Sequence, residues 1–386
     1  MSNISRKFGS DFARWCGAPH GFPFWKGRVA LYAILKALGV GQNDEVVLPG
    51  YTCVVVANPI MYLGATPVYV DIEPMTFNMN VKLLEKKITP KSKIIIAQHT
   101  YGYPCDMDAI MNIAKRKGIT VIEDCCLAFG SKYQGKTVGT FGKASYYSFQ
   151  WNKPYTTGLG GMAVVNDEEL AKKIVAICES QMVEPSSKEV LMLAVQLAAY
   201  RAFVYPKTTA LLQDLFRQFT NKGVVVGSWT VGEFTSPKMP SKFFKGMSAV
   251  QAYAGLKQLR KIEQNIAHRK KMAQLYDKLL GEKGWRSRSY DASATEPVMV
   301  RYPVRITEKN KAIEKATAAR VELGSWFDSP LHPCGTPLAA YAYEPGMCPE
   351  SEKAAREVVN LPLHPRVNEK TVRKTVEFII GYTEGV

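Results

Sequence analysis

Residues 93–124, KIIIAQHTYGYPCDMDAIMNIAKRKGITVIED, contain the clearest indication of the fold class. Two short apolar runs, KIIIAQH (93–99) and ITVIED (119–124), have the length and composition of buried strands. Between them, DMDAIMNIAKRKG (106–118) has apolar residues at helical spacing and ends in a glycine, as helices often do. Strand, helix and strand in this order predict two parallel strands joined by a crossover helix.

The same alternation extends on both sides of this unit, from about residue 27 to residue 166. Further strands are expected at EVVLP, TPVYVDI, ASYYSF and MAVVND (45–49, 66–72, 144–149, 162–167), and further helices at VALYAILKALGV and VVVANPIMYLGA (29–40, 54–65). Strands interleaved with helices at this spacing predict an α/β fold, with a mainly parallel sheet covered by helices on both faces. In such sheets, ligands bind outside the carboxyl ends of the strands.

The second half of the chain has a different pattern. Residues 167–265 are mostly helical or irregular, with a break at 220–244, and a long helix is expected over about 247–281. Separate strands, such as VMVRYPVRI (298–306), and further helices follow, which is typical of a smaller α+β domain. At 386 residues the chain is long for one core, so we expect two domains.

The chain carries a diffuse positive charge. It has 50 Lys and Arg against 34 Asp and Glu, which gives a formal net charge of +16. The densest basic stretches, such as KKITPKSK (86–93) and HRKK (268–271), are short and interrupted, whereas nucleic-acid binders usually concentrate their charge. An anionic small-molecule ligand therefore explains the charge better than nucleic acid does.

The cysteines and the N-terminus favour a reducing cytoplasm. None of the eight cysteines forms a CxxC pair and the five histidines are scattered, so we expect no metal site. The N-terminus, MSNISRKFGSDFARW, lacks the apolar core of a signal peptide. The segment VLMLAVQLAAYRAFVY (190–205) is too short to span a membrane and contains Gln196 and Arg201. We expect a buried or interface helix there, with a membrane-surface helix as the alternative.

Two polar residues stand where strands are expected to end. In SFQWNKPYTTGLGG (148–161), Lys153 follows an expected strand, and Asp124 ends the run TVIED. Taken alone, such a lysine is most often a solvated loop cation, and such an aspartate a helix cap or an ion-pair partner. Together they suggest pyridoxal phosphate chemistry, in which a lysine amine forms a Schiff base with the aldehyde and a carboxylate keeps the pyridine nitrogen protonated. The glycine cluster that follows fits a tight turn better than a phosphate loop.

At these residues the sequence resembles the sugar aminotransferases of the DegT/DnrJ/EryC1/StrS family, over nearly its whole length. The matching blocks, in chain order, are KGRVALYAILKALGVGQNDEVVLPGYTC, LGATPVYVDI, HTYGYPCDMDAI, VIEDCCLAFG, SYYSFQWNK with GLGG, MSAVQAYAGLKQL, and SPLHP with CPESEKAAREVVNLPLHP. The resemblance implies a type I aminotransferase fold. That fold has a large cofactor-binding domain (1–265) with a mainly parallel, seven-stranded sheet and a smaller C-terminal α+β domain (266–386). Residues 182–244 are the least family-like, and we expect them to shape acceptor choice or a dimer contact.

The resemblance implies roles for residues around the cofactor and substrate. Lys153 matches the Schiff-base lysine, and Asp124 matches the partner of the pyridinium nitrogen. Ser148, five residues before the lysine, matches a hydroxyl that contacts the cofactor phosphate. On the substrate side, His332 in SPLHP matches a pocket histidine, and Tyr51 and Gln150 are further candidate pocket residues.

Gly27, Arg28 and Val29 match a turn at a helix start whose backbone amides cradle the cofactor phosphate. Arg28 stands where many members have threonine, so it would add a cation to this site; the alternative is a surface arginine. Two nearby features of the family are replaced. Leu159 occupies the position of a glutamate, and Phe244 that of an asparagine which the neighbouring subunit lends to the phosphate.

The sequence also departs from the family around the cofactor ring. Leu127 stands where many members have a glutamine that hydrogen-bonds the phenolic oxygen, and Phe129 where a histidine is often found. The aromatic residue that stacks on the ring is replaced by Cys53, so we expect Tyr51 or Phe129 to stack instead. These changes leave Lys153 and Asp124 in place.

The sequence therefore predicts a pyridoxal 5′-phosphate-dependent aminotransferase that converts a nucleotide-linked keto-sugar to an amino-sugar, with L-glutamate or glutamine as donor. A homodimer with shared active sites is implied by the resemblance. Alternative acceptors are a cyclitol or a lipid-linked sugar approached through the 190–205 helix. A non-catalytic relative that binds a ligand or partner is the alternative that the departures favour. Lys153 argues against the dehydratases of the family, which carry a histidine at that position.

Overall fold

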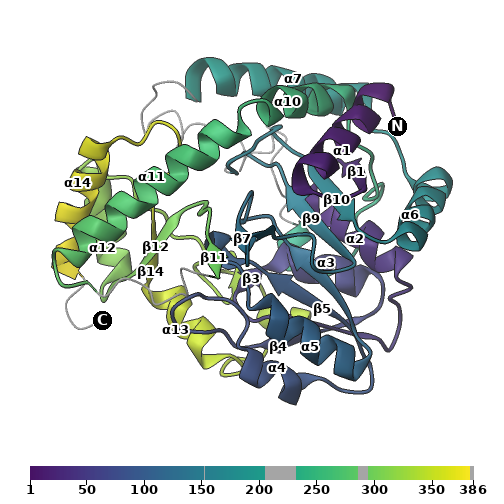
Figure 1. Ribbon diagram of the computed structural model, residues 1–386, viewed down its shortest axis with the longest axis horizontal. Coiled ribbons are helices and arrows are strands. Elements are labelled where there is room, and N and C mark those ends of the chain that lie inside the picture. The colour runs from purple at the N-terminus through teal and green to yellow at the C-terminus, as the bar shows by residue number, and fades with distance from the viewer. Residues whose placement is uncertain (152, 205–231, 286–293, 383–386) are drawn as a thin grey trace.

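The computed structural model describes residues 1–151, 153–204, 232–285 and 294–382, and the chain forms a seven-stranded central sheet (Figure 1). In spatial order the strands are β1 (His20–Phe24), β10 (Gly161–Val165), β9 (Ala144–Ser148), β6 (Thr120–Asp124), β5 (Ser92–Gln98), β2 (Glu45–Pro49) and β4 (Thr66–Val70). β10 is antiparallel to both of its neighbours, whereas every pair from β9 to β4 is parallel. The prediction of an α/β fold with a mainly parallel sheet is confirmed.

Helices cover both faces of this sheet (Figure 1). Strand side chains point alternately to the two faces, so Ile94 and Ile96 pack with α2, α3 and α6, whereas Ile95 packs with α1, α4, α5 and α10. The bounds of these helices are α1 (Asn3–Cys16), α2 (Gly27–Ala37), α3 (Val54–Tyr62), α4 (Val81–Lys87), α5 (Met107–Lys117), α6 (Glu168–Gln181) and α10 (Ala249–Leu259). Burial on both faces explains why the strands are continuous apolar runs in the sequence.

The crossover unit at residues 93–124 forms as predicted. Its helix, α5, begins after Asp106, whose carboxylate accepts a hydrogen bond from the Ala109 N–H, and ends at Gly118 with φ of 68°. β1 was not predicted from the sequence. Its residues, HGFPF, include a glycine and a proline, and Pro23 is tolerated because β1 is an edge strand.

The C-terminal part is built on α11 (Ile262–Gly281) and an antiparallel pair of strands, β12 (Tyr302–Arg305) and β14 (Val358–Leu361). Its other helices are α12 (Lys309–Ala318), α13 (Pro349–Glu357) and α14 (Glu369–Ile379). The hydrophobic core of this part also contains Tyr101 and Leu127 from the first half of the chain. The C-terminal strands and helices therefore share a core with the residues that follow β5 and β6, and a domain boundary at residue 265 stays a prediction.

One predicted helix is two helices in the structure. Residues 247–281 form α10 and α11, because Lys261 has φ of −116° and ψ of 5°, which is not helical. α10 begins with a capping box in which Ser248 and Gln251 each bond the other's backbone N–H, so its start is fixed by side chains. Of the expected break at 220–244, residues 220–231 lie outside the described residues.

The apolar segment 190–205 is helical as far as the structure describes it. It belongs to α7 (Ser187–Ala199) and a following π-helical stretch, Tyr200–Val204, whereas residue 205 lies outside the described residues. Leu193 and Leu197 pack in a small cluster with tryptophan side chains, so one side of the helix is buried, whereas a contact of this helix with a partner stays a prediction. Within the described ranges, no helix has both the length and the apolar character that crossing a bilayer requires.

Candidate active site

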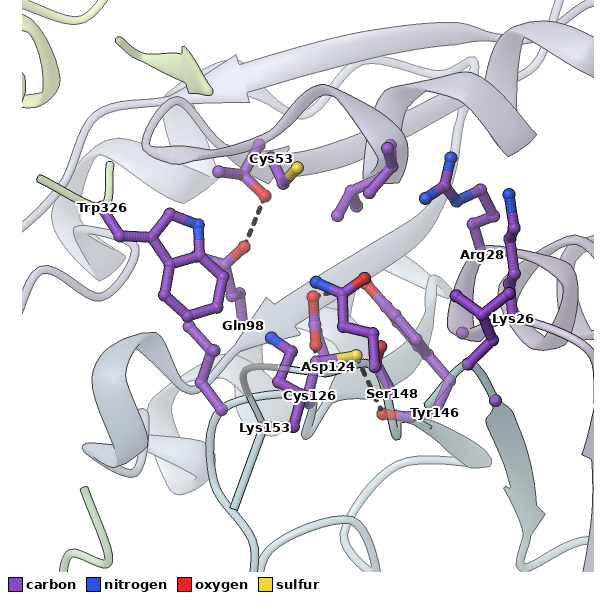
Figure 2. Close-up of a pocket in the computed structure, with 18 of the residues that line it drawn as sticks. Lys26, Arg28, Cys53, Gln98, Asp124, Cys126, Tyr146, Ser148, Lys153 and Trp326 are labelled. Atoms are coloured by element: carbon purple, nitrogen blue, oxygen red, sulfur yellow. Dashed lines mark hydrogen bonds between the residues drawn. The ribbon is translucent and has the colours of Figure 1, made fainter. Parts of the chain in front are cut away.

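A cavity lies at the carboxyl ends of β5, β6 and β9, where a parallel sheet is expected to bind its ligand (Figure 2). Lys153 and Trp326 lie at one side of it, Lys26 and Arg28 at the other, with Asp124 between them. The remaining lining residues are Gly27, Thr52, Cys53, Val55, Val56, Gln98, Cys126, Leu127, Tyr146, Ser148, Gln150, Leu159, Gly160 and Phe327. Most of the residues singled out in the sequence therefore meet in one cavity.

Asp124 is a buried carboxylate held by two donors. Its Oδ1 accepts a hydrogen bond from the Cys126 N–H at 2.9 Å, and its Oδ2 accepts one from the Tyr146 hydroxyl at 2.5 Å. Burial of a carboxylate without partners is costly, and these bonds satisfy part of its acceptor capacity. The charge faces the cavity, where it can attract a protonated ring nitrogen.

Lys153 is not a solvated loop cation. Its side chain is only 9% exposed, and burial lowers the pKa of its amine, although Cys126 and Asp124 oppose this shift. The Nζ atom lies 4.3 Å from the centre of the Trp326 indole ring. A buried amine with a lowered pKa is the form of lysine that attacks carbonyl carbons.

Helix α2 begins in close contact with two strands. A Cβ atom on Gly27 would lie 2.9 Å from Ser148 Cβ, and one on Gly161 would lie 2.4 Å from the backbone of Lys26, so both positions require glycine. α2 has no side-chain N-cap, and a helix start of this kind attracts anions. The Val29 amide donates to the Lys26 carbonyl at 3.1 Å and Val29 is not among the lining residues, so its part in a phosphate cradle stays a prediction. Gly27 and Arg28, in contrast, do line it.

Three charged side chains form a cluster at this helix start. Arg28 Nη1 lies 2.7 Å from Glu233 Oε1, and Lys26 Nζ lies 3.4 Å from Glu233 Oε2. Glu233 belongs to the short helix α9 (Gly232–Thr235) and is 3% exposed. Burial and the charge of Arg28 lower the pKa of Lys26 to about 8, although Glu233 opposes this. Two cations and one anion leave a net positive charge that suits an anionic group. Arg28 is therefore not a surface arginine.

The aromatic rings expected to stack on the cofactor are placed elsewhere. Tyr51 is fully buried, its hydroxyl lies 2.9 Å from that of Tyr101, and it is not among the lining residues. Phe129 packs with Phe12 and Tyr147 in the core on the opposite face of the sheet. Neighbouring residues in the sequence, Cys53 and Leu127, line the cavity instead.

His332 lies next to the cavity rather than in its lining. It belongs to β13 (Leu331–His332), which pairs in parallel with β3 (Thr52–Cys53). Its Nδ1 lies 2.6 Å from Asp328 Oδ1, and its ring packs edge-on against Trp326 with centroids 6.3 Å apart. Burial raises the pKa of Asp328, but the hydrogen bond and charge of His332, together with backbone hydrogen bonds such as that from the Cys334 N–H, leave that pKa below its usual value.

Two other predicted positions are accounted for by packing. Leu159 lines the cavity, and its carbonyl accepts a hydrogen bond from Gln251 Nε2 at 2.9 Å, which fixes the turn before β10. Phe244, in place of the family asparagine, is buried against Phe24 and Tyr32.

The residues of this site that the sequence did not indicate include Tyr146, Trp326 and Glu233. Tyr146 carried a usable signal, since it lies two residues before Ser148 in a strand and therefore points to the same face. Trp326 and Glu233 come from segments far from the motifs, and only the fold brings them to the cavity.

A cluster on the other face of the sheet also escaped notice. His99, Glu123 and Cys125 are buried close together, but the polar atoms of the first two already have protein partners. Glu123 Oε1 accepts from the Phe141 and Gly142 amides at 2.8 Å, and His99 Nε2 lies 3.1 Å from Glu123 Oε2. The cluster is a hydrogen-bond network that fixes β6 next to Asp124.

Comparison with known proteins shows that the chain is similar to aminotransferases in sequence and fold. The sequence model of the DegT/DnrJ/EryC1/StrS aminotransferase family matches residues 2–199 and 210–380. GDP-perosamine synthase of Caulobacter vibrioides is 31% identical over 97% of this chain and 90% of the relative. UDP-2-acetamido-2-deoxy-3-oxo-D-glucuronate aminotransferase of Pseudomonas aeruginosa is 32% identical over 94% of this chain and 86% of the relative. The crystal structure of an aminotransferase from Psychrobacter cryohalolentis superposes with a TM-score of 0.76, covers 98% of this chain and 91% of that one, and is 24% identical.

The fold and the relatives together define an aminotransferase of the α/β class. Since the family model spans both halves, the chain belongs to the DegT/DnrJ/EryC1/StrS aminotransferase family. The resemblance noted from the sequence motifs is thereby confirmed.

Proposed function

We propose that this aminotransferase uses pyridoxal 5′-phosphate to convert a nucleotide-linked keto-sugar to an amino-sugar, with L-glutamate or glutamine as donor. The observation that carries the proposal is that one cavity contains the buried amine of Lys153, the Asp124 carboxylate and the start of α2. These are the three groups that the cofactor's aldehyde, ring nitrogen and phosphate require, so the residues present fit it. When bound, the cofactor supplies an electron sink for the carbanion formed at the donor's α-carbon.

Each residue then has a distinct task. The Lys153 amine would hold the cofactor through its aldehyde, and as a free amine it would move the proton at the donor's α-carbon. The lowered pKa of Lys153 favours the neutral amine that this transfer requires. Asp124 would hold the proton on the ring nitrogen, and Ser148, Gly27 and Arg28, which line the same cavity, would hold the phosphate.

The acceptor is assigned from charge and from the relatives. Two relatives carry GDP-linked or UDP-linked sugars in their names. A net charge of +16 attracts a nucleotide diphosphate, so an anionic substrate explains the diffuse positive charge without nucleic-acid binding. Gln150 and Cys53 line the cavity, and His332 lies beside it, as the candidate contacts for the ring and the sugar.

We further propose a cytoplasmic homodimer with shared active sites. Phe244 is buried within its own chain, so the partner's contribution to the phosphate site has to come from a different residue. Sedimentation velocity of the purified protein is expected to give a dimer. A monomer with full activity would contradict this part of the proposal.

The experiment that tests the cofactor is a visible absorption spectrum of the protein with added pyridoxal phosphate. We expect a band from the Schiff base, and its loss in Lys153→Ala. Lys309→Met is the matched control, because Lys309 is also a buried lysine, and burial lowers the pKa of its amine to about 8. A band that persists in Lys153→Ala and disappears in Lys309→Met would refute the assignment.

The acceptor is tested by a spectral screen. Protein carrying the amine form of the cofactor is mixed with individual keto-sugars, and return of the aldehyde-form spectrum reports amino transfer. A nucleotide-linked keto-sugar is expected to restore it faster than the free sugar or a cyclitol ketone. Faster turnover of the free sugar or the cyclitol would overturn the assignment of a nucleotide-linked acceptor.

A further inference from the structure

The neighbouring strands β6 and β9 bring two polar side chains together at the cavity floor. Asp124 is the last residue of β6, and in the parallel pairing of the two strands it stands opposite Tyr146 of β9. Directly opposed residues of adjacent strands point to the same face, so the carboxylate and the phenol meet. Figure 2 shows the phenol of Tyr146 reaching the Asp124 carboxylate.

The two oxygens of Asp124 have different partners. Oδ2 lies 2.5 Å from the Tyr146 hydroxyl, within the short range of O–H donors to carboxylates, and Oδ1 lies 2.9 Å from the Cys126 N–H. Each carboxylate oxygen accepts about two hydrogen bonds, so capacity for a third donor in the cavity remains. The phenol thus orients the carboxylate and leaves it able to accept a further hydrogen bond.

The Tyr146 hydroxyl stays protonated and therefore remains a hydrogen-bond donor to Asp124. Tyr146 is 2% exposed, and burial together with the charge of Asp124 raises the pKa of its hydroxyl well above the usual value of 10. The hydroxyl therefore keeps its proton at every working pH. Its backbone is fixed as well, since the Tyr146 carbonyl accepts from the Cys125 N–H at 3.0 Å.

We propose that Tyr146 is a positioning residue that keeps Asp124 ionised and aimed into the cavity, so that the shared proton resides on the ring nitrogen of the cofactor rather than on the carboxylate. This inference rests on the proposed function, because it concerns the cofactor's ring. A donated hydrogen bond stabilises the charged carboxylate and makes it a weaker base. With a weaker base opposite, the proton stays on the nitrogen, and the ring remains an effective electron sink.

The test is Tyr146→Phe in the cofactor-loaded protein, with ¹⁵N-labelled pyridoxal phosphate. The ring-nitrogen chemical shift in the variant is expected to move toward the value of the unprotonated ring, in the same direction as in Asp124→Asn. The kcat is expected to fall about tenfold, as for loss of one hydrogen bond to a charged group, with a smaller change in KM. A purely structural role for Tyr146 would lower stability and leave the nitrogen shift unchanged.

Tyr147→Phe is the matched control. Tyr147 is the next residue of β9 and is equally buried, but it points to the other face, where its hydroxyl donates to the Val138 carbonyl at 3.2 Å. It is expected to keep the wild-type nitrogen shift and kcat. An unchanged Tyr146→Phe, or an equal shift in Tyr147→Phe, would overturn the inference alone. Absence of the Schiff-base band from the wild-type protein would overturn the proposed function and the inference with it.

Discussion

The Nζ of Lys153 lies 4.3 Å from the centre of the Trp326 indole ring, although the two residues come from opposite halves of the chain. An ammonium group over an indole is attracted by the ring's quadrupole, and tryptophan gives the strongest interaction of this kind. The indole therefore covers one side of the amine. The C-terminal half therefore contributes directly to the environment of the proposed catalytic lysine.

Replacement of this ring is expected to impair the amino-donor reaction. Trp326→Ala should lower kcat/KM for the donor about tenfold, because the indole holds the Lys153 side chain in place, and Trp326→Phe by about threefold, since phenylalanine keeps a smaller ring beside the amine. Steady-state kinetics with the donor measures both. Trp285→Phe, at a tryptophan that packs in the C-terminal core, is expected to retain wild-type kinetics. Full activity of Trp326→Ala would show that the indole does not influence Lys153.

Anion binding at the start of α2 is expected to weaken above pH 8. Burial and Arg28 lower the pKa of Lys26 to about 8, and a bound dianion favours the charged amine. As pH rises through 8, the free protein loses this charge, and the affinity for the anion falls. Inorganic sulfate is a suitable probe because it does not titrate in this range. Its dissociation constant, measured by calorimetry from pH 7 to pH 9.5, should rise.

The Lys26→Met variant separates this effect from other titrations. It is expected to bind sulfate more weakly than the wild-type protein at pH 7 and with a flatter dependence on pH. If the variant shows the same rise in dissociation constant as the wild-type protein, another group is responsible for the loss of affinity.

The parallel strands of the sheet could be predicted from the sequence, because burial on both faces makes each of them a continuous apolar run. The run IIIA in β5 and the helix ending at Gly118 illustrate this. The sequence did not indicate β1, since HGFPF is short and contains a glycine and a proline, which are both rare in strands. It also failed at Lys261, where no glycine or proline marks the break between α10 and α11.

The site was predictable only where residues lie next to strand ends. Asp124, Ser148 and Lys153 could be proposed because the fold places carboxyl ends of parallel strands together. Glu233 and Trp326 reach the cavity through long-range packing, which local patterns do not encode. The prediction that Phe129 stacks on the cofactor fails, because the turn after Asp124 directs its ring into the hydrophobic core.

Loss of the buried anion at the start of α2 is expected to destabilise the protein. Glu233→Gln leaves Arg28 and Lys26 without their counter-charge, and breaking a buried ion pair costs about 3 kcal/mol of unfolding free energy. Sulfate should recover part of this loss by binding to the folded state. The rise in Tm on addition of sulfate is therefore expected to be larger in the variant than in the wild-type protein.

An exposed ion pair provides the control for this charge change. Glu296→Gln removes a carboxylate 3.1 Å from Lys270, but Glu296 is 48% exposed, so the free energy of unfolding should change by less than about 1 kcal/mol. Equal destabilisation by the two substitutions, or a sulfate response unaffected by Glu233→Gln, would contradict the role assigned to the buried cluster.

The contact between α2 and β9 predicts a steric effect on the cofactor site. In Gly27→Ala, the new Cβ would lie 2.9 Å from Ser148 Cβ and 3.2 Å from the Tyr147 carbonyl oxygen, so the helix start has to move away from the strand. The cost is about 1–3 kcal/mol of unfolding free energy, as for overpacking of a core. Since the displaced amides and the Ser148 hydroxyl would no longer converge, apparent affinity for pyridoxal phosphate should fall at least tenfold. Gly41→Ala, where nothing lies within 4 Å of the added Cβ, should leave both quantities unchanged. Normal cofactor affinity in a destabilised Gly27→Ala variant would separate the α2 start from the phosphate site and refute that assignment.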